Sequence, residues 1–207
     1  MIHYLDMENS QNDTFPGIQE GEKILSVITP HPSVFTLEYV KLIAASLLVL
    51  IGFSSLGKIH PVFVTVGILL SITALILGAI LYHSLHSKRI AYITDRRIVR
   101  CEPSNAFVVN HRSLSWDDTS KIKTFSTNFL WRLKNIGTVI IHSKTSSATL
   151  NTTDSTFMTN DDIVLKNVHY YKDLGNYIDK ILYLHKNDKS EISKLHSFVP
   201  KPKGQRY

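Results

Sequence analysis

Cysteine and charge are both scarce in this chain of 207 residues. Its single cysteine, Cys101, excludes an intrachain disulfide and a zinc site built from cysteines. Charged residues make up 19% of the chain, against roughly 25% in an average globular protein. The deficit is local, because Lys58 is the only charged residue between Leu42 and Ser87. This pattern excludes an ordinary soluble domain and an intrinsically disordered chain.

Catalytic motifs are missing as well. The chain contains no GxSxG, P-loop, GxGxxG or HExxH sequence, so nothing in it indicates an enzyme, and we expect neither a cofactor nor a metal site. Its first fifteen residues are polar and acidic without an apolar segment, and we therefore expect no cleavable signal peptide.

The positive charge of the chain is concentrated in its second half. Residues 88–207 carry twenty Lys and Arg against eleven Asp and Glu, whereas residues 1–41 are acidic. Such a basic half is typical of proteins that contact nucleic acid or an anionic membrane surface. The neighbouring apolar segment favours membrane lipids, and the scarcity of aromatic residues among the bases of the tail speaks against nucleic acid.

Two apolar runs predict a transmembrane hairpin. Residues 62–82 contain no charge, and at about 1.5 Å per residue they span roughly 30 Å, the thickness of the hydrocarbon core. Residues 39–56 form the other run, and Gly57 to Pro61 make a polar turn between them. Basic residues follow the second run while the turn holds only Lys58, so the positive-inside rule predicts a multi-pass protein of the cell membrane with both termini in the cytoplasm.

Small residues recur along one face of the second predicted helix, at Gly67, Ser71, Ala74 and Gly78. Such a face allows close approach of another helix in lipid. One interpretation is packing against the first helix through Ala45 and Gly52; the other is a seam for a homo-oligomer or for a protein partner.

After Lys88 the pattern changes to short strands and one helix. β-rich runs are found at residues 89–93, 98–101, 106–114, 122–125, 138–142 and 162–165. Leu174, Ile178, Ile181 and Leu182 then recur with a helical period. This order predicts a small β-barrel or sandwich plugged by a C-terminal helix.

Four segments, residues 91–98, 116–122, 137–141 and 163–168, together resemble the bacterial pleckstrin-homology (PH) domain of the YdbS/YdbT-like type. The resemblance covers about residues 20–184, and proteins of this type carry paired transmembrane helices directly before the domain. It implies a PH-like fold of two near-orthogonal antiparallel sheets with a C-terminal helix, and it implies no activity. The Ser/Thr/Asn/Asp-rich stretch 143–161 departs from the pattern, and is interpreted as a solvated loop, an extended hairpin or a partner-binding loop.

The expected fold class is therefore membrane-anchored α+β, a two-helix transmembrane hairpin followed by a PH-like β-barrel or sandwich capped by a helix. The expected parts are a cytoplasmic segment 1–35, the hairpin 36–87 with helices at about 38–56 and 62–83, the domain 88–184, and a basic, disordered tail 185–207.

A basic cluster beside the predicted membrane is the main candidate site, formed by Lys88, Arg89, Arg96, Arg97 and Arg100. These residues are expected to contact the membrane surface or anionic lipid; alternatively they are a topology signal and a hairpin turn neutralised by Asp95. Two functions remain open. The first is a non-catalytic adaptor or accessory subunit of a membrane assembly. The second is a module that binds lipid head groups or a small ligand in envelope maintenance or stress.

Overall fold

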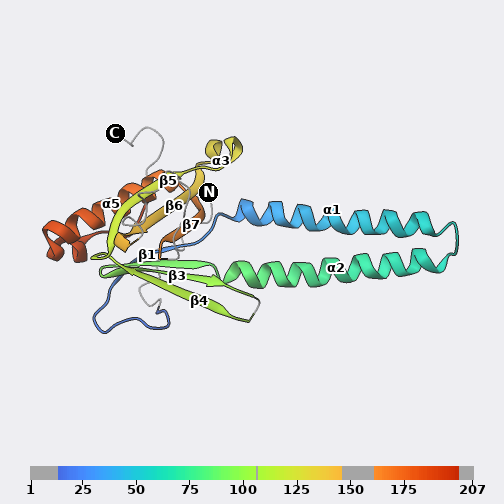
Figure 1. Ribbon diagram of the computed structural model, residues 1–207, viewed down its shortest axis with the longest axis horizontal. Helices are drawn as coiled ribbons and strands as arrows, with labels where there is room; N and C mark the ends of the chain where they lie inside the picture. The colour runs from blue at the N-terminus through green and yellow to red at the C-terminus, as the bar shows by residue number, and fades with distance from the viewer. Residues whose placement is uncertain (1–13, 106, 146–160, 201–207) are drawn as a thin grey trace.

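The computed structural model describes residues 14–105, 107–145 and 161–200 (Figure 1). Its elements follow in the order β1 (Ile24–Ile28), α1 (Pro32–Leu56), α2 (Val62–Ser87), β2 (Ile90–Thr94), β3 (Arg97–Pro103), β4 (Val109–Ser115), β5 (Thr119–Phe125), α3 (Phe129–Leu133), β6 (Ile136–Ser143), β7 (Ile163–His169), α5 (Tyr171–Asn187) and the 3₁₀ helix η2 (Lys189–Lys194). Of the stretch 143–161, residues 146–160 lie outside the described residues.

Two antiparallel sheets and helix α5 form the folded domain. The first sheet has the strand order β1-β2-β3-β4 and the second has the order β5-β6-β7. Among the described residues the sheets stay separate, since β4 is not hydrogen-bonded to a strand of the second sheet. The predicted two-sheet architecture with a C-terminal helix is confirmed, and a closed barrel is not found.

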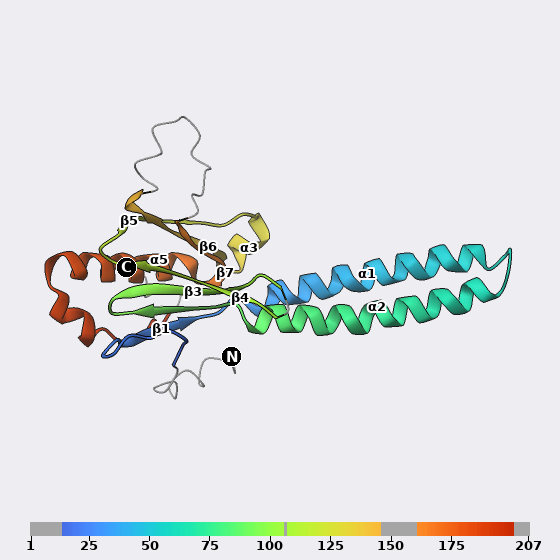
Figure 2. The ribbon, with the colours of Figure 1, turned by 60° about the horizontal axis from the view of Figure 1, so that its bottom comes forward.

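One apolar core joins both sheets to α5. Strand β6 is buried at all eight positions, and the side chains of Leu174, Ile178 and Ile181 on α5 are fully buried against the sheets. The helical period of these residues therefore marks the face that fills the space between the sheets (Figure 2). Trp116, at 1% exposure, completes the core and donates its indole N–H to the Thr94 carbonyl.

Strand β1 precedes the two long helices, yet it pairs with β2, the first strand after them. Ile28 lies opposite Ala91, and Val27 lies opposite Tyr92. Helices α1 and α2 are therefore an insertion between two neighbouring strands (Figure 2). The folded domain begins before the predicted boundary at residue 88. A run of five residues such as β1 is too short for periodicity to separate a strand from a loop, which is why this strand was missed.

Helices α1 and α2 project from one end of the domain as an antiparallel pair (Figure 1). With 25 and 26 residues at about 1.5 Å each, they are roughly 38 Å long. Both are long and apolar enough to cross a membrane, and only 11% of the apolar stretch in each is buried. The helices thus expose a continuous apolar surface that the domain does not cover.

Both helices are longer than predicted at their domain ends. Helix α1 begins at Pro32 rather than near residue 38, because proline is favoured in the first helical turn and His31 caps the helix. The His31 Nδ1 atom accepts a hydrogen bond from the Ser33 backbone N–H at 3.1 Å. At the other end α2 continues to Ser87, so each helix joins its strand through a short connection.

The residues after α5 pack on the domain instead of forming a disordered tail. Ile192 in η2 is 2% exposed, and Phe198 packs against the core. The Tyr177 hydroxyl donates to the His196 carbonyl at 2.9 Å. The domain therefore extends beyond the predicted limit at 184; residues 201–207 lie outside the described part of the chain.

Candidate functional site

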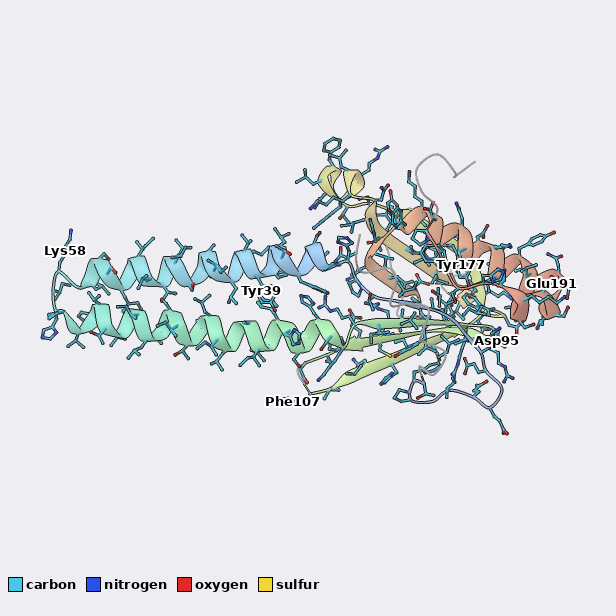
Figure 3. All side chains as sticks on the ribbon, turned by 180° about the vertical axis from the view of Figure 1, so that it is seen from behind. Tyr39, Lys58, Asp95, Phe107, Tyr177 and Glu191 are labelled. Carbon is cyan, nitrogen blue, oxygen red and sulfur yellow. The ribbon has the colours of Figure 1, made fainter. Side chains whose placement is uncertain are left out.

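The domain has two ends, which are distinguished by the position of the helices. The helices leave from one end, which also carries the β3–β4 connection with Phe107, while Asp95 and Glu191 lie at the opposite end (Figure 3). We call these the helix-proximal end and the far end. The predicted site residues are distributed between them.

The predicted basic cluster does not form one site. Lys88 and Arg89 directly follow α2 at the helix-proximal end, whereas Arg96 and Arg97 lie beyond β2 at the far end. The five residues of β2 at about 3.3 Å each separate the two groups by roughly 17 Å. The five bases lie close together in sequence, but an extended strand places the residues at its two ends far apart in space.

Arg97 fastens the segment before β1 to the domain. The buried Glu22 carboxylate accepts hydrogen bonds from Arg97 Nε and Nη2, both at 2.9 Å, and from Thr94 Oγ1 at 2.8 Å. Burial raises the pKa of Glu22, but the hydrogen bond from Arg97 and further bonds outweigh it, so its pKa lies below the ordinary value. Arg97 also lies over the ring of Phe15, which stacks on Tyr92. Arg97 is thus part of an internal contact.

Arg100 also forms an ion pair within the domain. Its Nη2 atom lies 2.6 Å from Glu102 Oε2, and 14% of its side chain is exposed. Burial lowers the pKa of the Arg100 guanidinium, although Glu102 opposes the shift. Beside it, between the start of α1 and strands β2, β3 and β7, is a cavity of about 50 Å³. This volume accommodates water molecules and is too small for a lipid head group.

The small residues of α2 lie partly on its contact with α1. Gly67 and Ser71 are buried, and Ser71 Oγ donates to the Ser46 carbonyl at 3.1 Å. A Cβ atom added at Gly67 would meet Phe53, and one at Gly78 would meet Leu42. In contrast, the predicted packing residue Ala74 is exposed.

The residues of α1 that were predicted to pack against α2 lie next to the contact in sequence but outside it in the structure. Ala45 and Gly52 are both exposed, and a Cβ atom at Gly52 would meet nothing within 4 Å. At about 100° per residue, the line formed by Leu42, Ser46 and Phe53 is rotated by roughly 80–100° from these two residues. Residue size alone therefore predicted that small residues of α1 face α2. In the structure, two large side chains of α1, Leu42 and Phe53, pack against glycines of α2.

A wider cleft separates the edges of the two sheets. It has a volume of about 630 Å³ and is lined by Arg112, Ser113, Leu114, Asp118, Ser143, Lys144, Thr145, Asp161 and Ile163. Leu114 pairs with Ile98, near the β2–β3 turn, which places the cleft toward the far end. Sequence patterns did not indicate this cleft, because it arises where β4 and β7 diverge.

Two His–Asp pairs were not anticipated. His142 Nδ1 lies 2.9 Å from Asp162 Oδ2, and the other carboxylate oxygen accepts from the Ser143 backbone N–H at 3.0 Å. His185 Nε2 lies 2.9 Å from Asp117 Oδ1, and this contact lowers the pKa of Asp117. The described residues contain no group of three His, Cys, Asp or Glu side chains that could hold a metal. Both pairs join neighbouring elements of the fold.

Cys101 is buried on β3, with its Sγ atom 3.2 Å from His111 Nδ1. Burial raises the pKa of the Cys101 thiol, which disfavours the reactive thiolate. This position indicates that Cys101 is a small packing residue.

Comparison of the chain with family models, with curated proteins and with solved structures returns no match. The resemblance to YdbS/YdbT-like proteins accordingly stays a prediction.

Proposed function

We propose that this chain is a non-catalytic integral membrane protein whose hairpin, α1 and α2, spans the cell membrane with both termini in the cytoplasm. Its PH-like domain then acts as an adaptor or accessory subunit of a membrane assembly. A protein partner is the expected ligand of the domain.

The exposed apolar surface of the hairpin supports the membrane anchor. Leu48 and Leu69 are 70% and 61% exposed, and most other large side chains of the two helices are similarly uncovered. Burying such side chains in lipid is favourable by about 1.5–3 kcal/mol each relative to water. Because the hairpin is inserted between β1 and β2, two short connections tie the domain to the anchor.

The cleft of about 630 Å³ is the observation that carries the adaptor function. One of its walls is β4, an edge strand that, among the described residues, pairs only with β3, and four consecutive residues of this strand are exposed. Exposed strand edges offer backbone groups to a segment of another protein. The charged side chains in the lining, such as Arg112, Lys144 and Asp161, give such a segment polar partners. The cleft lies toward the far end, which the proposed orientation of the hairpin directs toward the cytoplasm.

Co-purification from gently solubilised membranes tests this function. We expect a partner in stoichiometric amount with the wild-type chain, and its loss after the paired change Arg112→Glu and Lys144→Glu in the cleft. The matched control is Lys121→Glu with Lys123→Glu, which makes the same charge change on exposed residues of β5. The adaptor function is rejected if the wild-type chain retains no stoichiometric partner, or if both pairs of changes have the same effect.

Binding of lipid head groups or small ligands is the weaker candidate. The cavity near Arg100 is small, and Arg96 and Arg97 follow β2 at the far end of the domain. Selective binding of one anionic lipid by the full chain, beyond the effect of charge, would favour this second function.

A further inference from the structure

Helix α3 presents an apolar face that the domain leaves open. Phe129, Leu130 and Leu133 are 73%, 70% and 61% exposed. At about 100° per residue these three side chains fall within an arc of roughly 100°. Arg132 and Lys134, both exposed, flank this arc on its two sides. An apolar face between two basic side chains is typical of helices that lie in a membrane interface.

The surrounding structure holds α3 in one orientation. Trp131, on the side opposite the apolar face, is half-buried. The helix ends at Leu133, and Asn135, with a φ of 55°, then turns the chain toward β6. The Asn135 N–H donates to Arg132 at 3.1 Å, and its carbonyl accepts from the Tyr170 N–H at 2.8 Å. These hydrogen bonds and the turn at Asn135 therefore fix the direction in which the apolar face of α3 points.

The β3–β4 connection presents a second apolar group. Phe107 is 93% exposed and Val108 is 50% exposed. The Asn105 side chain accepts hydrogen bonds from the N–H groups of both residues, at 3.0 and 2.9 Å. Ser104 also donates its N–H to the Val108 carbonyl at 2.9 Å. This turn keeps Phe107 at the tip, where folding of the domain gains nothing from an aromatic side chain.

Both apolar groups lie at the helix-proximal end, on opposite sides of the base of the hairpin. Figure 1 shows α3 beside the start of α1, and Figure 3 shows Phe107 beside the last turns of α2. Two apolar groups therefore flank the hairpin where it joins the domain. Basic side chains lie near them, at Lys88, Arg89, Arg132 and Lys134.

We propose that α3 and the β3–β4 connection insert into the interfacial layer of the bilayer and seat the domain on an anionic membrane surface. This inference rests on the proposed function, because it requires the hairpin to span the same bilayer. Two contacts on opposite sides of the hairpin prevent the domain from tilting, and they direct the far end with its cleft toward the cytoplasm.

Tryptophan fluorescence of the full chain tests this seating. The chain has two tryptophans, and Trp116 is buried in the core. In a Trp131→Phe background, a reporter is placed by Phe129→Trp or by Phe107→Trp. The protein is reconstituted in nanodiscs of dibrominated phosphatidylcholine with phosphatidylglycerol, where bromine quenches tryptophan within the acyl region. We expect each reporter to lose about half of its emission, since interfacial apolar groups reach the acyl boundary.

Two further reporters in the same background separate the possible failures. Tyr183→Trp replaces an exposed aromatic near the end of α5, away from the hairpin, and should not be quenched. Leu69→Trp lies within α2 and should be quenched if the hairpin spans the bilayer. If the reporter at position 69 is quenched but the reporter at 107, at 129 or at both is not, the seating is overturned and the anchor is left intact. A protein ligand for these groups would give this result. No quenching at position 69 rejects the anchor and the seating together.

Discussion

The Glu22 carboxylate joins a segment before the hairpin to a turn after it. It accepts bonds from Arg97 and Thr94 while its own side chain is fully buried. Hydrogen bonds to a charged group are worth about 1.5–3 kcal/mol each in net stability, and a buried partner left unpaired costs more than the bond itself. This contact fastens the segment before β1 to the β2–β3 turn at the far end of the domain.

The change Glu22→Gln should lower the free energy of unfolding by about 2 kcal/mol, because it removes the charge that Arg97 requires. Denaturant unfolding in mild detergent measures this loss. The difference from wild type should shrink as the pH falls below the ordinary glutamate pKa of about 4.3, because the unfolded chain takes up the proton before folded Glu22, whose pKa is lowered, does so. The exposed Arg96, 3.4 Å from Gln19, provides the control, and Arg96→Ala should cost less than about 0.5 kcal/mol. Equal losses in both variants would contradict the role of Glu22.

We expect His31 to make the junction between the domain and α1 sensitive to pH. Burial lowers the pKa of His31, and the nearby His169 ring, whose centroid is 4.6 Å away, lowers it further. Burial also lowers the pKa of His169. A proton on His31 Nδ1 would remove the acceptor for the Ser33 N–H.

Stability should therefore decrease as the pH falls below about 6.5, because the unfolded chain binds protons there before the folded chain does. Thermal unfolding at pH 7.5 and 5.5 measures the decrease. His31→Asn keeps a capping side chain without a titrating group, so it should match wild type at pH 7.5 and lose less at pH 5.5. An unchanged pH dependence in this variant would show that other groups cause the decrease.

At the scale of elements, the contact between α1 and α2 depends on glycine in α2 facing large side chains in α1. Phe53 and Leu42 occupy the space that a Cβ atom would need at Gly67 and Gly78. In lipid, helices gain little from hydrophobic burial against each other, so close packing and the Ser71–Ser46 hydrogen bond hold the pair together.

The paired change Gly67→Leu and Gly78→Leu should separate the helices and lower the amount of protein in membranes. Leu69→Ile with Leu77→Ile is the control, since both residues are exposed at 61% and 56% and the change keeps their volume. Quantitative immunoblotting of membranes reports the protein level, and size in mild detergent reports assembly. A normal level with a smaller assembly would instead place a partner helix on this face.

At the scale of the whole molecule, the hairpin is inserted between β1 and β2, two strands that pair with each other in the first sheet. A fragment starting at residue 88 lacks β1, and with it the buried side chains of Leu25 and Ile28. Each such side chain contributes about 1.5–3 kcal/mol when buried. The loss is comparable with the whole stability of a small domain.

Replacing residues 32–87 by a short Asn-Gly turn should leave a soluble, folded domain, because Ile28 and Ala91 already face each other in neighbouring strands. The fragment 88–207 should be unfolded or aggregated. Circular dichroism and cooperative thermal unfolding distinguish the two proteins. If the fragment without β1 unfolds as cooperatively as the bridged protein, the first strand is dispensable.

Orientation in the membrane is tested with single cysteines in a Cys101→Ser background. In intact cells a membrane-impermeant reagent should label Lys58→Cys in the turn, and should not label Tyr183→Cys on α5. The distribution of Lys and Arg predicts this result. The reverse labelling would place the domain outside the cell.

The positions of the functional residues were only partly predictable. The sequence identified the basic residues as candidates for a site. Because β2 lies between them, however, Arg97 is at the far end while Lys88 is near the helices. The apolar face of α3 has a signal in residues 129–134, where a phenylalanine and two leucines occur together with Arg132 and Lys134. Whether such a run is buried or exposed depends on the surrounding fold, and this is why the sequence did not reveal it.

Contiguous patterns determined the two long helices, most of the strands and α5, because hydrophobic length and period are properties of neighbouring residues. Pairings between distant residues were decided only in the tertiary structure. Strand β1 joins β2 across the whole hairpin, and Phe53 rather than Gly52 meets Gly67. In each case the free energy comes from a contact between segments far apart in the chain, which no local pattern records.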